Sequence, residues 1–261
     1  MKIKGIPEVS RIDEWVACSK KYDIAFEYND FFNPWLLDHK ERLEEVINIY
    51  LAADRDRSQD TLHGAFFDIV VGSSDPKIEE VSMFRIRQSL DIAKRLGVKG
   101  VIFHTNYLTS FKLNSYLQGW LNANQKTFTA LCDEYYPMNI YMENMFDVNP
   151  DLLVELAIRM DSVKNFGVCL DLAHAYISGT NITNWLDEVL PYTKHLHVND
   201  NFGNEDSHLP IGEGDFDWDI LNDDRIRKTG ADILLEVKNG LAGFEKSLKY
   251  LVDNKIYPYN K

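Results

Sequence analysis

The chain has 261 residues, of which 45% are hydrophobic, and its formal net charge is −13. This length is sufficient for one sizeable core, so we expect one domain over residues 1–261. Nucleic acid is not an expected partner, because duplex binding relies on Lys and Arg side chains that contact phosphates, and the sequence contains no basic stripe.

The sequence contains no sign of a membrane or of an oxidising compartment. No run of about 18 apolar residues occurs. The first ten residues, MKIKGIPEVS, lack the apolar stretch of a secretory signal. Cys18, Cys132 and Cys169 have no CxxC spacing, which is typical of buried free thiols. We therefore expect a cytoplasmic protein without a membrane partner.

Apolar runs alternate with amphipathic segments along the chain. The predicted strands are residues 2–5, 23–28, 60–63, 99–104, 138–143, 166–171, 195–198 and 233–236. The predicted helices are residues 11–21, 40–52, 78–96, 113–135, 150–160, 183–190, 217–227 and 241–253. The helix at 78–96 has the clearest pattern, because Val81, Phe84, Ile86, Leu90 and Ala93 recur near a spacing of 3.6 and Gly97 follows.

This alternation predicts an α/β fold, namely a (β/α)8 TIM barrel with its active site at the C-terminal ends of the strands. An open doubly wound sheet is the alternative, but no G-x-G-x-x-G motif follows the first predicted strand. In a barrel, side chains at the ends of all eight strands can meet in one place.

Histidine and carboxylate side chains recur at those strand ends. They are His63, His104, Glu143, Asp171, His197 and Glu236, and His174, Asp206 and His208 follow just beyond strands. Burial of an unpaired carboxylate costs several kcal/mol, roughly, unless a cation or metal compensates it. Mixed His and carboxylate ligands suit Zn, Mn, Fe or Co better than Ca or Mg. We therefore expect a divalent metal cofactor, Mn, Co or Zn, and two or more ions close together could share bridging carboxylates.

Each of these residues also has a simpler explanation when it is taken alone. Glu236 could form an ion pair with Lys238, and Asp171 could cap a helix while His174 is incidental. His195 alternates with His197 and is expected either in the core or behind a metal ligand as its support. Tyr107 belongs to an aromatic group with Phe111, Tyr116 and Trp120 that could cover a sugar ring or merely pack a long loop.

Five segments make the chain similar to a known superfamily: HGAFFDIVVGSSDP, VIFHTNY, YMENM, GVCLDLAHAY and HLHVNDNFGNEDSHLPIGEGDFDW. It resembles the xylose isomerase-like TIM-barrel superfamily, which includes sugar phosphate isomerases and epimerases and also endonuclease IV (AP endonuclease family 2). The isomerase branch implies one metal on Glu143, Asp171, His197 and Glu236, with the two glutamates moving a proton. The endonuclease branch implies three zinc ions on all nine residues given above.

The chain departs from the endonuclease pattern in two places. Endonuclease IV typically has D-T-C-H where this chain has Asp171-Leu172-Ala173-His174, and basic residues where the loop 199–208 has none. One M²⁺ with three carboxylates gives a site charge of about −1, which suits a neutral sugar, whereas three M²⁺ with four carboxylates give about +2, which suits a phosphate ester.

The leading hypothesis is a metal-dependent isomerase or epimerase of a small sugar or sugar phosphate. In it, Glu143 and Glu236 are catalytic, and His174, His208 and Tyr107 bind substrate. The alternative is an endonuclease IV-like multinuclear zinc phosphodiesterase. A lyase, a barrel that only binds sugar or metal, and a homodimer formed through outer helices stay open.

Overall fold

The computed structural model describes residues 1–260, and its centre is a closed barrel of parallel strands in chain order. The strands are β1 (Ile3–Gly5), β2 (Ala25–Tyr28), β3 (Thr61–His63), β4 (Gly100–His104), β5 (Asn139–Glu143), β6 (Phe166–Asp171), β7 (Thr193–Val198) and β8 (Asp232–Leu235). Pairing of Ile3 with Ile233 and of Lys4 with Leu234 joins the first strand to the last. The predicted TIM barrel is confirmed.

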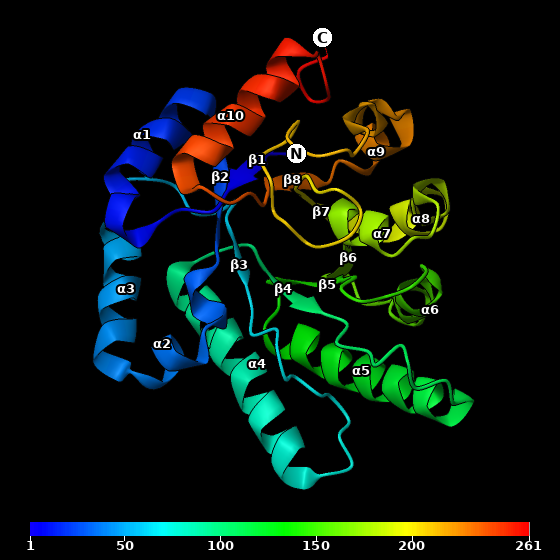
Figure 1. Cartoon of the computed structure of the whole chain (residues 1–261). Coiled ribbons are helices and arrows are strands. Elements are labelled where there is room, and N and C mark those ends of the chain that lie inside the picture. The colour runs from blue at the N-terminus through cyan, green and yellow to red at the C-terminus, as the bar shows by residue number, and fades with distance from the viewer. Residues whose placement is uncertain (261) are drawn as a thin grey trace.

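Helices surround the strands (Figure 1). They are α1 (Ile12–Tyr22), α2 (Pro34–Asp38), α3 (Lys40–Ala52), α4 (Pro76–Leu96), α5 (Asn114–Glu134), α6 (Asp151–Arg159), α7 (Leu172–Ile177), α8 (Ile182–Val189), α9 (Asp224–Thr229) and α10 (Gly240–Asp253). Short 3-10 turns lie at Val9–Arg11, Asp30–Phe32, Leu190–Tyr192 and Trp218–Asn222. Within residues 1–260, none of the helices has the length and hydropathy that a bilayer crossing requires.

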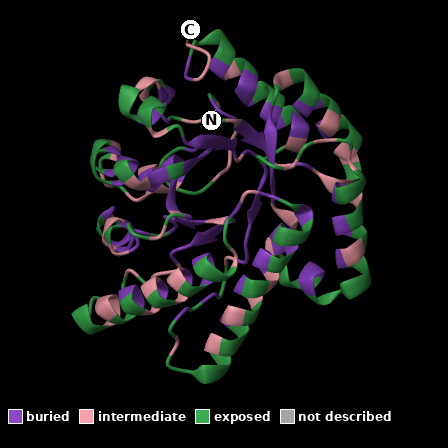
Figure 2. Cartoon of the chain, turned by 180° about the vertical axis from the view of Figure 1, so that it is seen from behind, coloured by how far each residue is buried: buried purple, intermediate pink, exposed green. Residues whose placement is uncertain are grey.

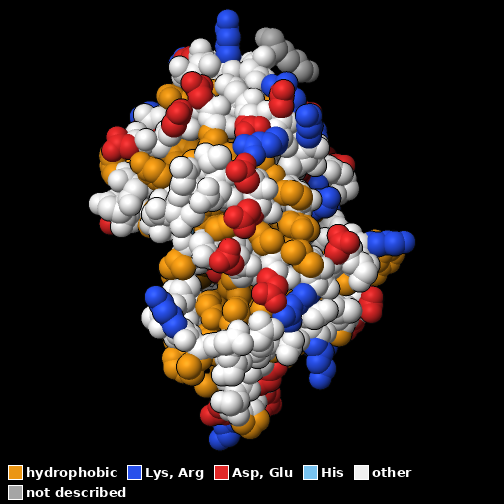
Figure 3. Space-filling model, turned by 90° about the vertical axis from the view of Figure 1, so that its right-hand side faces the viewer, with side chains coloured by type: hydrophobic (Ala, Val, Ile, Leu, Met, Phe, Trp, Pro, Cys, Tyr) orange, Lys and Arg blue, Asp and Glu red, His pale blue; other side chains and the backbone are white. Residues whose placement is uncertain are grey.

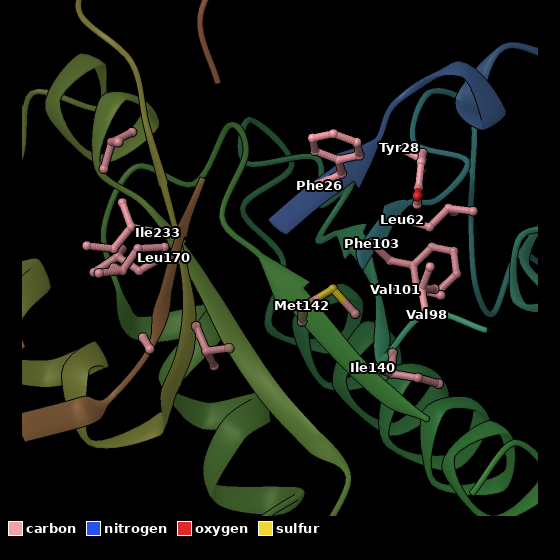
Figure 4. Packing of buried hydrophobic residues seen from close by; sticks show 14 of the residues in the cluster. Phe26, Tyr28, Leu62, Val98, Val101, Phe103, Ile140, Met142, Leu170 and Ile233 are labelled. Atoms are coloured by element: carbon pink, nitrogen blue, oxygen red, sulfur yellow. The ribbon is translucent and has the colours of Figure 1, made fainter. Parts of the chain in front are cut away.

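The barrel has two buried layers because alternate strand residues face opposite sides. Outward-facing residues such as Val101, Ile140 and Leu170 pack under the helices in the main hydrophobic core (Figure 4). The helices bury only the faces that they turn to the strands (Figure 2). The inner layer is more polar: it contains a small cluster of Ile102, Tyr141 and Cys169, and also the buried side chains of Lys4, Glu27, Thr61, His195 and His197.

Some predicted boundaries were wrong for identifiable reasons. The second strand begins at Ala25 rather than at residue 23, because Asp23 ends α1 in a left-handed conformation with φ of 53°. The predicted helix 217–227 is interrupted, because the Asp223 side chain accepts the backbone N–H of Arg225 and starts α9. Helix α2 was not predicted, and for the region of α7 only a helix cap at Asp171 was considered.

The buried face of α4 also differs from the prediction. Val81 and Phe84 are exposed, whereas Ser82 and Ser89 are buried. The Ser82 and Ser89 hydroxyls accept the backbone N–H groups of Val70 and Ala65, which lie in the loop between β3 and α4. Hydroxyl groups on this face therefore hold the loop that follows His63.

Candidate metal centre

Four side chains from neighbouring strands meet at the C-terminal end of the barrel. Glu143 ends β5, Asp171 ends β6, His197 lies in β7 and Glu236 directly follows β8. One ligand atom from each lies within 4.8 Å of the others. Nδ1 of His197 is 3.2 Å from Oε2 of Glu143 and 2.9 Å from Oε2 of Glu236. The structure thus brings together the four residues that the sequence suggested for a single metal.

A second group shares Glu143 with the first. His63 at the end of β3 and His104 at the end of β4 each direct Nε2 toward Oε2 of Glu143, at 3.9 and 3.3 Å. The other carboxylate oxygen, Oε1, is 3.6 Å from Nδ1 of His174. Glu143 therefore lies among four histidines, because His197 also contacts it.

The three remaining candidates gather at the edge of the site. Oδ2 of Asp206 lies 3.2 Å from Nε2 of His174 and 2.8 Å from Nε2 of His208. The Asp171 side chain caps α7 by accepting the backbone N–H of His174 at 2.6 Å. The helix cap that was an alternative role for Asp171 is therefore present, and its other carboxylate oxygen is still free for a ligand.

Backbone carbonyls fix the protonation of three of these histidines. Nδ1 of His63 contacts the carbonyl oxygen of Gly64, Nδ1 of His174 contacts that of Asn144, and Nδ1 of His208 contacts that of Glu236, at 2.8 to 3.0 Å. A carbonyl only accepts, so each Nδ1 carries a proton, and a metal held by any of these histidines would bind Nε2. Such outer hydrogen bonds are typical of metal-binding histidines.

The charged groups shift each other's pKa values strongly. Burial opposes ionisation of Glu143, but His197 and His104 outweigh burial and hold the pKa of Glu143 well below its usual value. Burial raises the pKa of Asp171 to about 7. Burial alone would lower the pKa of His208, but Asp206 and Glu236 raise the pKa to about 10. The carboxylates therefore favour the protonated, positively charged form of neighbouring histidines such as His208.

A divalent cation fits this arrangement. Both carboxylate oxygens of Glu143, Oδ2 of Asp171 and Nδ1 of His197 are buried without a hydrogen-bond partner. Among residues 1–260, no Lys or Arg forms an ion pair with the carboxylates of Glu143, Asp171, Asp206 or Glu236, so the ion pair between Glu236 and Lys238 is absent. Buried carboxylates without a basic partner are costly unless a metal compensates them.

A third group of possible ligands, Cys169 with His195 and His197, lies deeper in the barrel. Burial raises the pKa of the Cys169 thiol well above its usual value, so the thiolate form that binds metals is disfavoured. Nε2 of His195 already donates to Glu27 at 3.0 Å. This group is therefore better explained as packing than as a ligand set, and the prediction of His195 as a core residue is confirmed.

The site opens into a cavity of about 580 Å³. Its lining includes seven of the nine candidates, together with residues that had no predicted role: Asn29, Phe32, Phe66, Phe67, Met145, Phe146, Ile177 and Glu205. Phe66 packs between Phe32 and Phe67, with ring centres 4.8 and 4.0 Å away. Phe67 and Phe146 are 60% and 64% exposed. On the side of the molecule with α5, α6 and α8, hydrophobic side chains gather around a row of acidic ones (Figure 3).

The structure does not bring Tyr107 to this cavity. Its ring stacks on Tyr116 at 4.9 Å and meets the edge of Trp120 at 5.8 Å. This is the loop packing that was the alternative for Tyr107, and substrate contact by Tyr107 stays a prediction.

Asn144 supports the site but was not predicted. Its side-chain amide accepts the backbone N–H of Asp171 and donates to the Asp171 carbonyl oxygen, both at 2.9 Å. Its place directly after Glu143 was the only sequence signal.

Comparison with known proteins agrees with the barrel fold. The family model described as xylose isomerase-like TIM barrel matches residues 25–253. An uncharacterized protein of Methanocaldococcus jannaschii, MJ1311, is 28% identical over 203 residues, which are 73% of this chain and 68% of the relative. A protein named probable endonuclease 4 from Thermoplasma acidophilum is 28% identical over 213 residues, which are 74% of this chain and 72% of the relative.

Solved structures share the fold. The TTHB071 protein from Thermus thermophilus, described as soaked with ZnCl2, has a TM-score of 0.76 at 21% identity and covers 97% of each chain. A D-tagatose 3-epimerase-like protein has a TM-score of 0.71 at 21% identity, covering 97% of this chain and 98% of the other. At such identities, the likeness concerns the barrel and leaves the reaction open.

Proposed function

The chain belongs to the xylose isomerase-like TIM-barrel family, and on that premise we propose that it is a divalent-metal-dependent isomerase or epimerase of a small sugar. Glu143, Asp171, His197 and Glu236 would hold the metal, which could be Mn, Co or Zn. When bound, such an ion polarises adjacent hydroxyl and carbonyl oxygens of a sugar.

The two glutamates supply the proton transfer. Glu143 and Glu236 approach the same nitrogen of His197 from different strands. One takes the proton from the carbon beside the carbonyl, and the other returns a proton. Return on the opposite face epimerises the carbon. His174 and His208, which line the cavity, would contact sugar hydroxyls in this proposal.

One observation carries the choice of substrate. In the described chain, the cavity is lined by Glu143, Glu205, Asp206 and Glu236 and by no Lys or Arg. A phosphate group would meet these carboxylates without a Lys or Arg side chain to neutralise it, whereas a neutral sugar carries no charge that needs neutralising. The phenylalanine rings add an apolar wall, as is usual in small-molecule sites.

The test is solvent exchange at the carbon beside a carbonyl. Purified protein loaded with Mn²⁺, Co²⁺ or Zn²⁺ is incubated in D2O with a panel of free ketoses and, in parallel, with their phosphates. We expect deuterium to enter one or more free ketoses and the corresponding phosphates to react more slowly. If no sugar in either panel exchanges with any of the three metals, the isomerase proposal is wrong.

A phosphodiesterase is the second candidate, and one observation favours it. The two carboxylate oxygens of Glu143 face different histidines, Oε1 toward His174 and Oε2 toward His63, His104 and His197. His63, His104 and Glu143 also form a second close group of candidate ligands that shares Glu143 with the first, as a site for two metals would require. About three zinc ions per chain and hydrolysis of bis(p-nitrophenyl) phosphate would favour this candidate, whereas about one ion and no hydrolysis would favour the isomerase.

A further inference from the structure

A buried carboxylate beneath the candidate metal site has no role in the function proposed above. Glu27 lies in β2, in the interior of the barrel, and its side chain is fully buried. Within the described residues, the carboxylate forms ion-pair contacts only with His195 and His197. A buried charge placed against histidines rather than against Lys or Arg calls for a specific explanation.

The hydrogen bonds around Glu27 run in one direction. Lys4 in β1 donates from Nζ to Oγ of Thr61 at 3.0 Å, and that hydroxyl donates to Oε2 of Glu27 at 2.7 Å. Burial lowers the pKa of Lys4 only to about 8, so at neutral pH its amine is mostly an ammonium that only donates. The Thr61 oxygen therefore accepts from Lys4, and its proton points to Glu27.

Both oxygens of the Glu27 carboxylate also face histidine side chains, namely those of His195 and His197. Nε2 of His195 lies 3.0 Å from Oε2, which already accepts from Thr61. The second oxygen, Oε1, lies 3.1 Å from Nε2 of His197. The contact is an ion pair without hydrogen-bond alignment. A histidine that ligates a metal through Nδ1 keeps its proton on Nε2, and in His197 that proton would lie beside the Glu27 carboxylate. Nδ1 is the nitrogen that faces Glu143 and Glu236.

We propose that Lys4, Thr61 and Glu27 form a buried relay that orients His197 and presents its Nδ1 to the metal. Glu27 is thus a positioning residue that acts through His197. His63, His174 and His208 are held by backbone carbonyls, whereas the partner of His197 is a side chain. The proposal rests on metal binding in the proposed function, but not on the identity of the substrate.

The test compares Zn²⁺ affinity, measured by competition with a chromophoric chelator, with the thermal midpoint of the metal-free protein. Outer partners of metal-binding histidines typically contribute about 10- to 100-fold in affinity. We therefore expect Glu27→Gln to weaken binding of one Zn²⁺ equivalent by about 10- to 100-fold. Thr61→Val should weaken the same equivalent, and Thr61→Ser, which keeps the hydroxyl, should restore wild-type affinity.

Asp60→Asn is the matched control. Asp60 is also a buried carboxylate near the barrel, but it bonds Arg55, Tyr28 and the backbone of Phe26 and contacts none of the candidate ligands. The Asp60→Asn variant should have a lower thermal midpoint than the wild type and an unchanged affinity for Zn²⁺. The relay is refuted if Glu27→Gln binds Zn²⁺ as tightly as wild type, or if Asp60→Asn weakens binding equally.

The outcomes for the relay and for the proposed function are distinguishable. If the wild type binds no Zn²⁺, both are wrong. If the wild type binds Zn²⁺ and Glu27→Gln binds it equally well, the relay alone is wrong. If the wild type binds Zn²⁺ and Glu27→Gln weakens it, but no sugar exchanges solvent deuterium, the relay stands and the isomerase proposal fails.

Discussion

Nδ1 of His197 lies 2.9 Å from Oε2 of Glu236, so one imidazole nitrogen links the end of β7 to the residue that follows β8. The backbone supports this contact, because the N–H of Glu236 donates to the carbonyl oxygen of Val198 at 2.9 Å and continues the pairing of the two strands. Rigid strands therefore hold these two candidate ligands, which is the kind of support that a precise metal site requires.

Glu143→Gln tests the proposed proton transfer. The substitution keeps the shape of the side chain and removes its basicity, so we expect turnover of the sugar to fall by about 10²- to 10⁴-fold. Far-ultraviolet circular dichroism of the variant should match the wild type. Turnover within about twofold of wild type would remove Glu143 from the acid–base role, whatever the metal content.

Removal of the metal should destabilise the protein. Dialysis against a chelator leaves the carboxylates of Glu143, Asp171 and Glu236 without the cation that the site fits. A ligand present at 100 times its dissociation constant stabilises the folded state by about 2.7 kcal/mol. We expect calorimetry to show a lower thermal midpoint after dialysis and full recovery when Zn²⁺ or Mn²⁺ is added back. An unchanged midpoint with both ions would argue against a bound metal.

Phe67→Ala tests the apolar wall of the cavity. Phe67 lines the cavity and is 60% exposed, so its truncation should change the free energy of unfolding by about 0.5 kcal/mol or less. We expect KM for the sugar to rise several-fold while kcat is kept, because the ring contributes binding rather than chemistry. Val81→Ala, on the exposed face of α4, is the control and should leave KM unchanged. A loss confined to kcat would contradict the assignment.

Asp60 should make stability depend on pH. Burial raises the pKa of Asp60 to about 6, above its ordinary value of 3.8. An acid whose pKa is higher in the folded than in the unfolded chain binds its proton more tightly when folded, so its contribution to stability falls as pH rises toward 6. Between pH 4.5 and 7, wild type should lose about 2 kcal/mol relative to Asp60→Asn. Urea unfolding measures this difference, and a constant difference across the range would contradict the shift.

The barrel could be predicted because it depends on local patterns, and the four-ligand group because the resemblance to the family implied it. Strand-ending Glu143 and Asp171 are visible as acids directly after apolar runs, and parallel strands bring such ends together. The partners of Glu27 could not be predicted, because His195 and His197 lie on a distant strand and contact it only inside the closed barrel. Tyr107 was suggested for the substrate because aromatic residues that follow a barrel strand often lie near the site. The sequence does not show which way the loop packs, and in the structure the Tyr107 ring packs against Tyr116.

The buried face of α4 was predicted wrongly because contacts distant in sequence decide it. Its apolar spacing suggested a buried face that includes Val81 and Phe84, but buried serines on this helix are required to bond the backbone of the preceding loop. The spacing of apolar residues does not reveal the hydrogen bonds that a buried backbone segment must make, and here these bonds place serines on the buried face of α4.

An anomalous-scattering map of crystals soaked with Zn²⁺ tests the central claim most directly. The account predicts a peak at about 2.0 to 2.2 Å from ligand atoms of Glu143, Asp171, His197 and Glu236, with Nδ1 as the ligating nitrogen of the histidine. Fully soaked crystals without a peak among these four side chains would contradict it.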